Sequence, residues 1–143
     1  MPLCTHRVEV QAPAHVVWEF LVDKIQHPER YVPGVHGATV EEMGDPQCLV
    51  RTVELDGDRR IKERVSWTPS TRTVCFVLLD DPEFTGFLIN QVIEDEGRVL
   101  LEHTMNWRSR SGEEPEAESW ATKVREAALH TAAQAERRAA GIG

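Results

Sequence analysis

An acidic and a basic side chain, Glu63 and Arg51, stand on strand faces that are otherwise apolar, and such a pair can do chemistry. Alternate residues of a strand point to the same side, so Glu63 shares its side with three apolar residues: Ile61, Val65 and Trp67. A three-residue loop at 56–58 predicts that Arg51 lies directly opposite Glu63. Burial would make this carboxylate a usable base for a proton next to a carbonyl group, and Arg51 would stabilise the resulting enolate.

Three interpretations of this pair stay open. The first is an inward-facing ion pair that only fixes strand register, and the second is a pair that contacts a ligand or takes part in catalysis. The third is a pairing shifted by one residue, which would turn Glu63 to solvent. The turn at 68–71 predicts that Phe76 of the following strand lies beside Glu63.

His103 is the other candidate catalytic residue. It shares a strand face with apolar neighbours, namely Val99, Leu101, Met105 and Trp107. An imidazole titrates near neutral pH and suits proton transfer, although a hydrogen-bonded core histidine is the simpler explanation. Its partner is expected to be Asn90 or Gln91, because the turn at 95–97 leaves the register of the 84–94 and 98–109 hairpin open.

The elements that must position these residues follow from hydrophobic periodicity. A strand (5–11) is followed by a helix opened by Pro13 and ending near Lys24, then by a short helical turn at 27–31. Six further strands alternate with turn signals: 35–43, 48–55, 59–67, 72–79, 84–94 and 98–109. Their connections are too short for crossover helices, which predicts an antiparallel meander.

A long helix closes the chain after a polar linker at 111–115. Pro115, Glu116 and Glu118 open it, and residues 139–143 are expected to fray. One face is apolar and rich in small residues: Trp120, Val124, Ala127, Ala128, Thr131 and Ala135. The predicted fold class is therefore α+β, a curved seven-stranded sheet with this helix across its concave side and a cavity between them. Residues 1–143 are expected to be a single domain.

Composition and missing motifs narrow the function classes. Sixteen Lys and Arg against 24 Asp and Glu give a net charge of −8, which argues against nucleic acid and anionic membranes as partners. There is no membrane-spanning run and no signal peptide, so the expected compartment is the cytoplasm. Three separated cysteines exclude a disulfide framework and are expected to be buried thiols, and six scattered histidines predict no metal site. No cofactor is expected, because phosphate-loop, dinucleotide and nucleophile-elbow signatures are missing.

The sequence resembles a known superfamily. The opening 7–21, the stretch 28–33, the six strands and the long helix resemble START-like helix-grip proteins, also called SRPBCC proteins. Within that superfamily, 61–65 and 86–94 are similar to the AtaL-like branch. The resemblance implies a deep hydrophobic cavity under the C-terminal helix, and its members include lipid carriers, polyketide cyclases and dehydratases, and hormone receptors. It transfers neither iron nor a catalytic residue to this chain.

Three hypotheses for function remain. The first is a non-catalytic carrier or sensor of a small aromatic, polyketide-like or lipid-like molecule, and the second is a polyketide cyclase or dehydratase with Glu63 as base. The third is a module that binds a protein partner, and a homodimer through a sheet edge also stays open. The predicted ligand-binding residues are Arg51, Glu63, Trp67, Phe76, His103, Met105, Trp107, Trp120 and Val124.

Overall fold

Seven strands form one antiparallel sheet in the computed structural model, which describes residues 3–113 and 117–141. The strands are β1 (Cys4–Glu9), β2 (Val35–Glu42), β3 (Cys48–Leu55), β4 (Arg60–Thr68), β5 (Thr73–Leu79), β6 (Phe84–Asp95) and β7 (Arg98–Ser109). Their order in the sheet is β1-β7-β6-β5-β4-β3-β2. The predicted meander from β2 to β7 is therefore confirmed, and β1 completes the sheet by pairing with β7.

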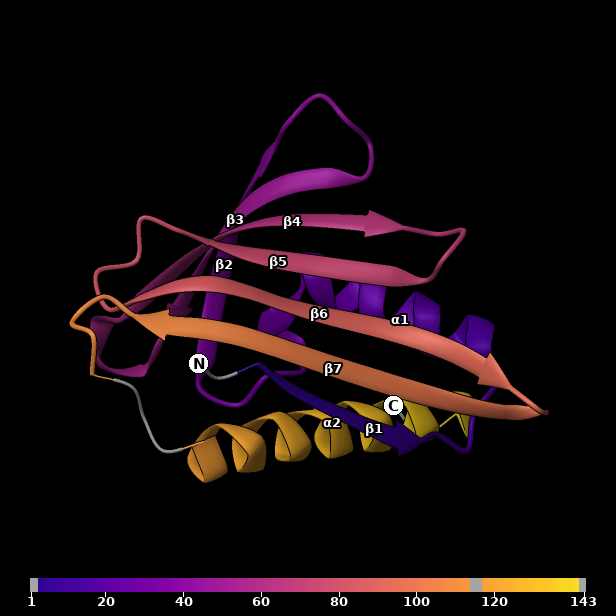
Figure 1. The fold of residues 1–143 in the computed structure, drawn as a ribbon. Helices are drawn as coiled ribbons and strands as arrows, with labels where there is room; N and C mark the ends of the chain where they lie inside the picture. The colour runs from indigo at the N-terminus through magenta and orange to yellow at the C-terminus, as the bar shows by residue number, and fades with distance from the viewer. Residues whose placement is uncertain (1–2, 114–116, 142–143) are drawn as a thin grey trace.

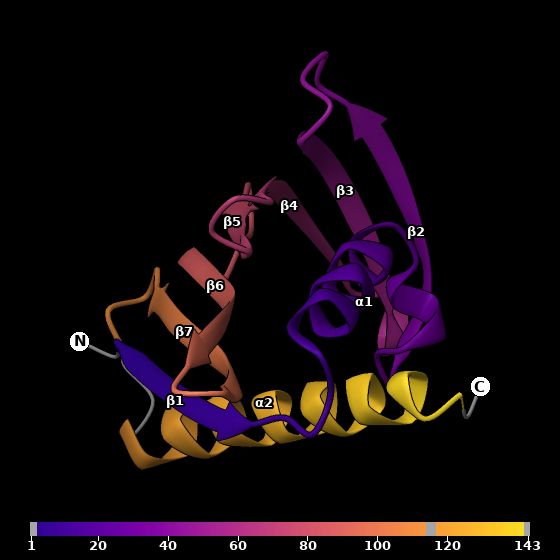
Figure 2. The same cartoon turned by 90° about the vertical axis from the view of Figure 1, so that its right-hand side faces the viewer.

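Two α-helices lie against this sheet. Helix α1 (Ala14–Gln26) follows β1 and leads into a single 3-10 turn, η1 (Pro28–Arg30), while α2 (Ala117–Ala139) comes last. The sheet curves so strongly that β1 and β7 stand across from β2 and β3, with α2 running along the open side and α1 between them (Figures 1 and 2). The predicted α+β helix-grip architecture is confirmed.

The apolar core gathers where α1, α2 and the sheet meet. Val17, Phe20 and Ile25 of α1 are fully buried, as are Val65 and Leu101 of the sheet. Helix α2 contributes small side chains to the same cluster: Ala128, Ala132 and Ala135. Small residues let the helix approach the sheet closely, so this end of the concave side is sealed by protein atoms.

Several element boundaries and exposures differ from the sequence predictions. Helix α1 runs two residues further than predicted, to Gln26, while β1 ends at Glu9 rather than residue 11. The predicted linker and the Pro115–Glu116 start of the long helix lie partly outside the described residues, as do 142–143 of the tail. Ala127 is exposed, because it lies about 100° around the helix from Ala128. The three cysteines are free, as predicted, but only partly buried.

Gly86 is a strand residue whose missing side chain allows two backbones to meet. Its φ is +130°, and a Cβ built there would lie 1.8 Å from the carbonyl oxygen of Asn106 on the neighbouring strand. Its register partner is Trp107, so the close approach positions the aromatic end of the concave side. No other residue type fits this position without moving β7.

We expect Gly86→Ala to lower the free energy of unfolding by more than about 3 kcal/mol, because it adds a backbone clash to left-handed strain. Gly97→Ala is the matched control: Gly97 has φ +80° with nothing within 4 Å of a built Cβ, so only strain of about 1–2 kcal/mol is expected. Urea denaturation of both variants measures the difference. Equal losses would show that the contact with Asn106 is not a constraint.

Candidate functional site

Arg51 and Glu63 face each other across β3 and β4, as the hairpin register predicts. The Arg51 Nε atom donates to the Glu63 Oε1 atom at 3.1 Å, and the two residues are only 9% and 8% exposed. The possibility that Glu63 faces solvent is therefore excluded. A buried pair of this kind is costly to break, because removing one partner leaves the other charge unpaired in the interior.

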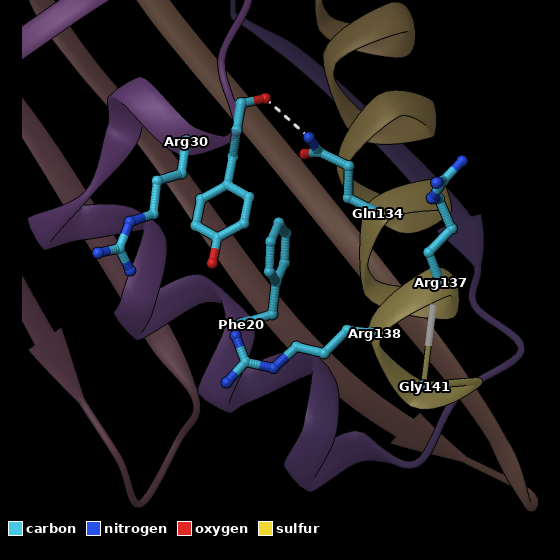
Figure 3. A pocket seen from close by; sticks show the side chains of 7 residues that line it. Phe20, Arg30, Gln134, Arg137, Arg138 and Gly141 are labelled. Atoms are coloured by element: carbon cyan, nitrogen blue, oxygen red, sulfur yellow. Dashed lines mark hydrogen bonds between the residues drawn. The ribbon is translucent and has the colours of Figure 1, made fainter. Parts of the chain in front are cut away.

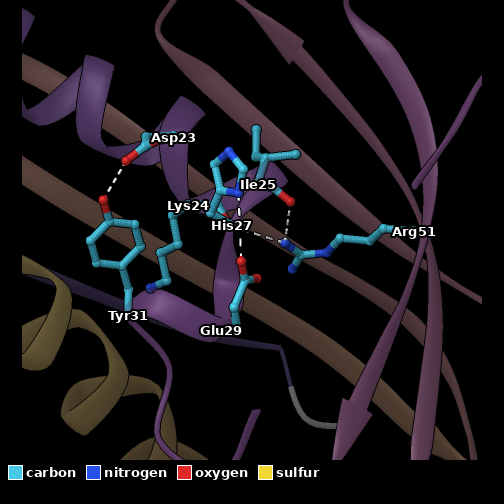
Figure 4. Close-up of polar contacts among 7 residues, drawn as sticks. All are labelled: Asp23, Lys24, Ile25, His27, Glu29, Tyr31 and Arg51. Carbon is cyan, nitrogen blue, oxygen red and sulfur yellow. Dashed lines mark hydrogen bonds and ion pairs between the residues drawn. The ribbon is translucent and has the colours of Figure 1, made fainter. Parts of the chain in front are cut away.

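The Arg51 guanidinium also holds the end of α1 (Figure 4). Its Nη1 atom donates to the backbone carbonyl of Ile25 at 2.8 Å and to that of Lys24 at 3.3 Å. These carbonyls belong to the last turn of the helix, where backbone acceptors lack intrahelical partners. The Arg51 side chain therefore ties helix, sheet and carboxylate together, and most of its donors are used within the protein.

Phe76 does not lie opposite Glu63, so that sequence prediction is wrong. Strand β5 pairs Phe76 with Val65 and sets Leu78 opposite Glu63, because the turn is two residues longer than expected and closes between Thr68 and Thr73. A shift of two residues keeps the face of the strand and changes only the partner. Phe76 therefore still points inward, and its ring centroid lies 5.0 Å from the Arg51 guanidinium carbon, a cation–π contact.

His103 lies in a row of polar side chains that crosses three strands. Its register partner on β6 is Asn90 rather than Gln91, and its partner on β1 is His6. His103 and Asn90 are 2% and 4% exposed. Burial first, and then the charges of Lys24 and His6, lower the pKa of His103 to about 3, so the imidazole is neutral at neutral pH.

Two atoms of this row have no hydrogen-bond partner among the described residues. They are the Nδ1 atom of His103 and the Oδ1 atom of Asn90. A buried polar atom without a partner lowers the stability of the fold by about 1–3 kcal/mol. Two such atoms side by side therefore call for a functional explanation. His6 was missed by sequence reasoning, because only the long-range pairing of β1 with β7 brings it here.

Lys24 is a second residue that sequence reasoning missed. Its Nζ atom donates to the Thr131 Oγ1 atom at 3.0 Å, bridging α1 and α2. Burial, together with the charge of Arg51, lowers the pKa of Lys24 to about 8. Helical spacing could have identified it, because Lys24 lies four residues after Phe20 and three after Leu21. It is therefore on the apolar face of α1.

The opposite end of the concave side is aromatic. The rings of Trp107 and Trp120 lie 6.1 Å apart, and the ring of Phe84 lies 5.6 Å and 5.8 Å from them. Trp120 and Val124 of α2 are buried, and the Trp120 Nε1 atom has no hydrogen-bond partner among the described residues. The sequence placed both tryptophans inward but did not single out Phe84, which joins them through the pairing of β6 with β7.

The remaining predicted residues lie apart from one another. Met105 pairs with Leu88 and Cys4 in the middle of the β7 face, whereas Trp67 lines a depression of about 400 Å³ beside the β2–β3 hairpin, with Leu49 and Cys48. Across residues 3–113 and 117–141, no three His, Cys, Asp or Glu side chains are grouped to hold a metal ion. Neither α1 nor α2 combines the length and apolar character needed to span a bilayer.

Comparisons with known proteins agree with this architecture. The Zhui aromatase/cyclase from Streptomyces sp. R1128 is 21% identical, with a TM-score of 0.72 over 95% of this chain and 94% of that one. A protein from Bacillus thuringiensis is 18% identical, with a TM-score of 0.72 over 94% and 98% of the two chains. The di-domain aromatase/cyclase BexL of the BE-7585A biosynthetic pathway is 18% identical, with a TM-score of 0.68 over 96% of this chain and 49% of that one. The chain thus spans about half of BexL.

At these identities the three structures show a shared fold. A comparison with curated proteins gives no significant match. The similarity to the AtaL-like branch stays a prediction, since none of these findings tests it. The family model described as "Polyketide cyclase / dehydrase and lipid transport" matches residues 1–136. The predicted START-like resemblance is thereby confirmed, and the chain belongs to the polyketide cyclase/dehydrase and lipid transport family.

Proposed function

We propose that the concave side of the sheet binds a small, largely apolar molecule of aromatic, polyketide-like or lipid-like character, and that the protein carries or senses it. The family supports a hydrophobic ligand-binding fold. The observation that carries the proposal is the pair of inward polar atoms without partners, His103 Nδ1 and Asn90 Oδ1. In an apolar surrounding, such atoms favour a ligand that brings a hydroxyl or carbonyl group to them.

The apolar neighbours of this pair support the same interpretation. Leu88 and Met105 are register partners, two residues along β6 and β7 from Asn90 and His103. Both are only partly buried. Trp107, further along the same face of β7, is also partly buried, whereas Leu101 on the other side of His103 is 0% exposed. The middle of the concave side is thus less tightly covered than its α1 end. A ligand seated there would cover this apolar surface and place its polar group at Asn90 and His103.

The contacts of Arg51 favour a carrier or sensor over an enzyme. An enolate needs donors that are free to meet developing negative charge. Arg51 instead uses most of its donors on Glu63 and on two carbonyls of α1. Protonating Glu63 would break the ion pair and leave the guanidinium charge uncompensated in the interior. A base that must do this in each turnover is poorly placed for proton abstraction.

Binding in the interior is tested by filling it. We expect Met105→Trp to weaken the affinity for N-phenyl-1-naphthylamine, a neutral apolar probe, at least about tenfold, because the indole would occupy space beside Leu88. Thr104→Trp is the matched control, since Thr104 lies one residue away on the outer face and pairs with Ile89. Fluorescence titration measures both affinities. A probe that binds the two variants equally well would rule out this location.

The buried neutral His103 predicts a pH dependence of stability. Its pKa is lowered from 6.5 to about 3, so between these values the unfolded chain binds a proton that the folded chain excludes. Stability is therefore lost as the pH falls through this window, by up to about 1.4 kcal/mol per pH unit from this group. We expect His103→Gln to flatten the fall in unfolding free energy between pH 6.5 and 4, measured by urea denaturation. Exposed His15, changed to Gln, should leave the slope unaltered; parallel curves for wild type and His103→Gln would contradict the assignment.

A cyclase or dehydratase is the second candidate, favoured by the burial of Glu63 on the concave face. In that case Glu63→Gln is expected to abolish turnover of a linear poly-β-ketone analogue while changing its binding only a few-fold, since the amide keeps the shape and loses the base. Product analysis together with a binding titration separates the two effects. Turnover by Glu63→Gln at the wild-type rate would contradict Glu63 as the base. If the wild type shows no turnover either, the carrier or sensor function is the one supported.

A further inference from the structure

A separate pocket lies at the far end of α2, where the helix meets α1 and η1. It has a volume of about 420 Å³ and is formed by Phe20 and Tyr31 together with the polar side chains of α2 (Figure 3). The two aromatic rings meet edge to face, with centroids 4.9 Å apart. None of the residues assigned to the concave interior lines this pocket, so its chemistry is independent of the proposed function.

Positive charge is concentrated around this pocket. Arg30, Arg137 and Arg138 line it, and no carboxylate does. The chain as a whole carries 24 acidic against 16 basic residues, so three arginines around one pocket run against its overall charge. They come from two elements, η1 and α2, and the chain must fold to bring them together. An arginine cluster of this kind suits a carboxylate, which guanidinium groups bind through paired hydrogen bonds.

The intramolecular ion pairs leave most of this charge free. Arg138 pairs with Asp23 at 3.3 Å, and Asp23 also accepts the hydroxyl hydrogen bond of Tyr31. Within the described part of the chain, Arg30 and Arg137 have no ion pair. Arg137 and Arg138 also lie near the C-terminus of α2, where cations are favourable, but that effect does not account for Arg30.

Gln134 adds a hydrogen-bond acceptor to the same pocket. Its Nε2 atom donates to the backbone carbonyl of Tyr31 at 2.7 Å, which fixes the amide. Its Oε1 atom is buried and has no partner among the described residues. In Figure 3 Gln134 and Arg30 lie on opposite sides of the pocket, and the Arg138 side chain extends from α2 past Phe20. A ligand with an acidic group at one end and a hydroxyl donor at the other matches this arrangement.

We propose that the pocket between η1, α1 and the end of α2 binds a small aromatic hydroxy acid. The carboxylate lies at Arg30 and Arg138, the ring packs against Tyr31, and the hydroxyl group donates to Gln134. The volume suits a molecule of two fused rings with room for water. The site is distinct from the concave interior and gives the protein a second, charge-selective binding function.

Three related probes test the proposal by isothermal titration calorimetry at 50 mM salt. We expect 6-hydroxy-2-naphthoate to bind more tightly than 2-naphthoate, which lacks the donor, and 2-naphthol, which lacks the carboxylate, to bind at least about tenfold more weakly than 2-naphthoate. Amide NMR spectra should place the largest shifts at Gly141 and the side-chain amide of Gln134. Equal affinity for 2-naphthol and 2-naphthoate, or shifts confined to β6 and β7, would overturn the proposal.

Charge variants complete the test. Arg30→Gln is expected to weaken 2-naphthoate about tenfold without loss of stability, because this arginine has no ion pair to lose. Arg138→Gln should act in the same direction, and Arg125→Gln, an exposed arginine elsewhere on α2, should change nothing. Met105→Trp, which blocks the concave interior, should leave 2-naphthoate binding intact. Unaltered binding in Arg30→Gln, or loss in Met105→Trp, would refute this site without bearing on the other.

Discussion

The contact between one guanidinium group and the last turn of α1 holds the layers of this protein together. Arg51 reaches from the sheet to the carbonyls of Lys24 and Ile25, with Glu63 and the Phe76 ring on its other sides. Strand β3 supplies the cation and the end of α1 supplies the acceptors. Their hydrogen bonds therefore fix the position of α1 relative to the sheet. The same contact fixes the last turn of α1, from which the Lys24 side chain enters the interior.

The interior is polar at only a few points, and its two titratable nitrogen groups are both shifted toward neutrality. The pKa of His103 falls to about 3 and that of Lys24 to about 8, each chiefly through burial. The Thr131 hydroxyl group partners the lysine, while a nitrogen of the histidine stays unpartnered within the described chain. An interior of this kind discriminates against charged ligands and admits hydroxyl and carbonyl groups, in contrast to the arginine-lined pocket at the end of α2.

The sequence predicted what local periodicity controls. Strand alternation placed Glu63 and His103 on the concave face, and a short turn predicted the partner of Arg51 correctly. The prediction of the Phe76 partner was wrong, because the register between β4 and β5 depends on the turn that joins them. The last residue of that turn, Arg72, adopts a left-handed φ of +50°. His6 could not be assigned from sequence, because the pairing of β1 with β7 joins segments distant in the chain, and Phe84 could not because the register of the β6–β7 hairpin was left open. Lys24 was available from helical spacing, but a lysine beside apolar residues is usually expected to reach solvent.

The pairing of the first strand with the last has a consequence for how the chain acquires its structure. Cys4 lies opposite Met105, so the final seam of the sheet joins segments about a hundred residues apart in sequence. Closing so large a loop is entropically costly and raises the contact order, which slows folding. During synthesis, β1 has no strand partner until β7 has left the ribosome. Its exposed backbone groups are then open to pairing with other chains, and chaperones that shield nascent strands would matter most in that interval.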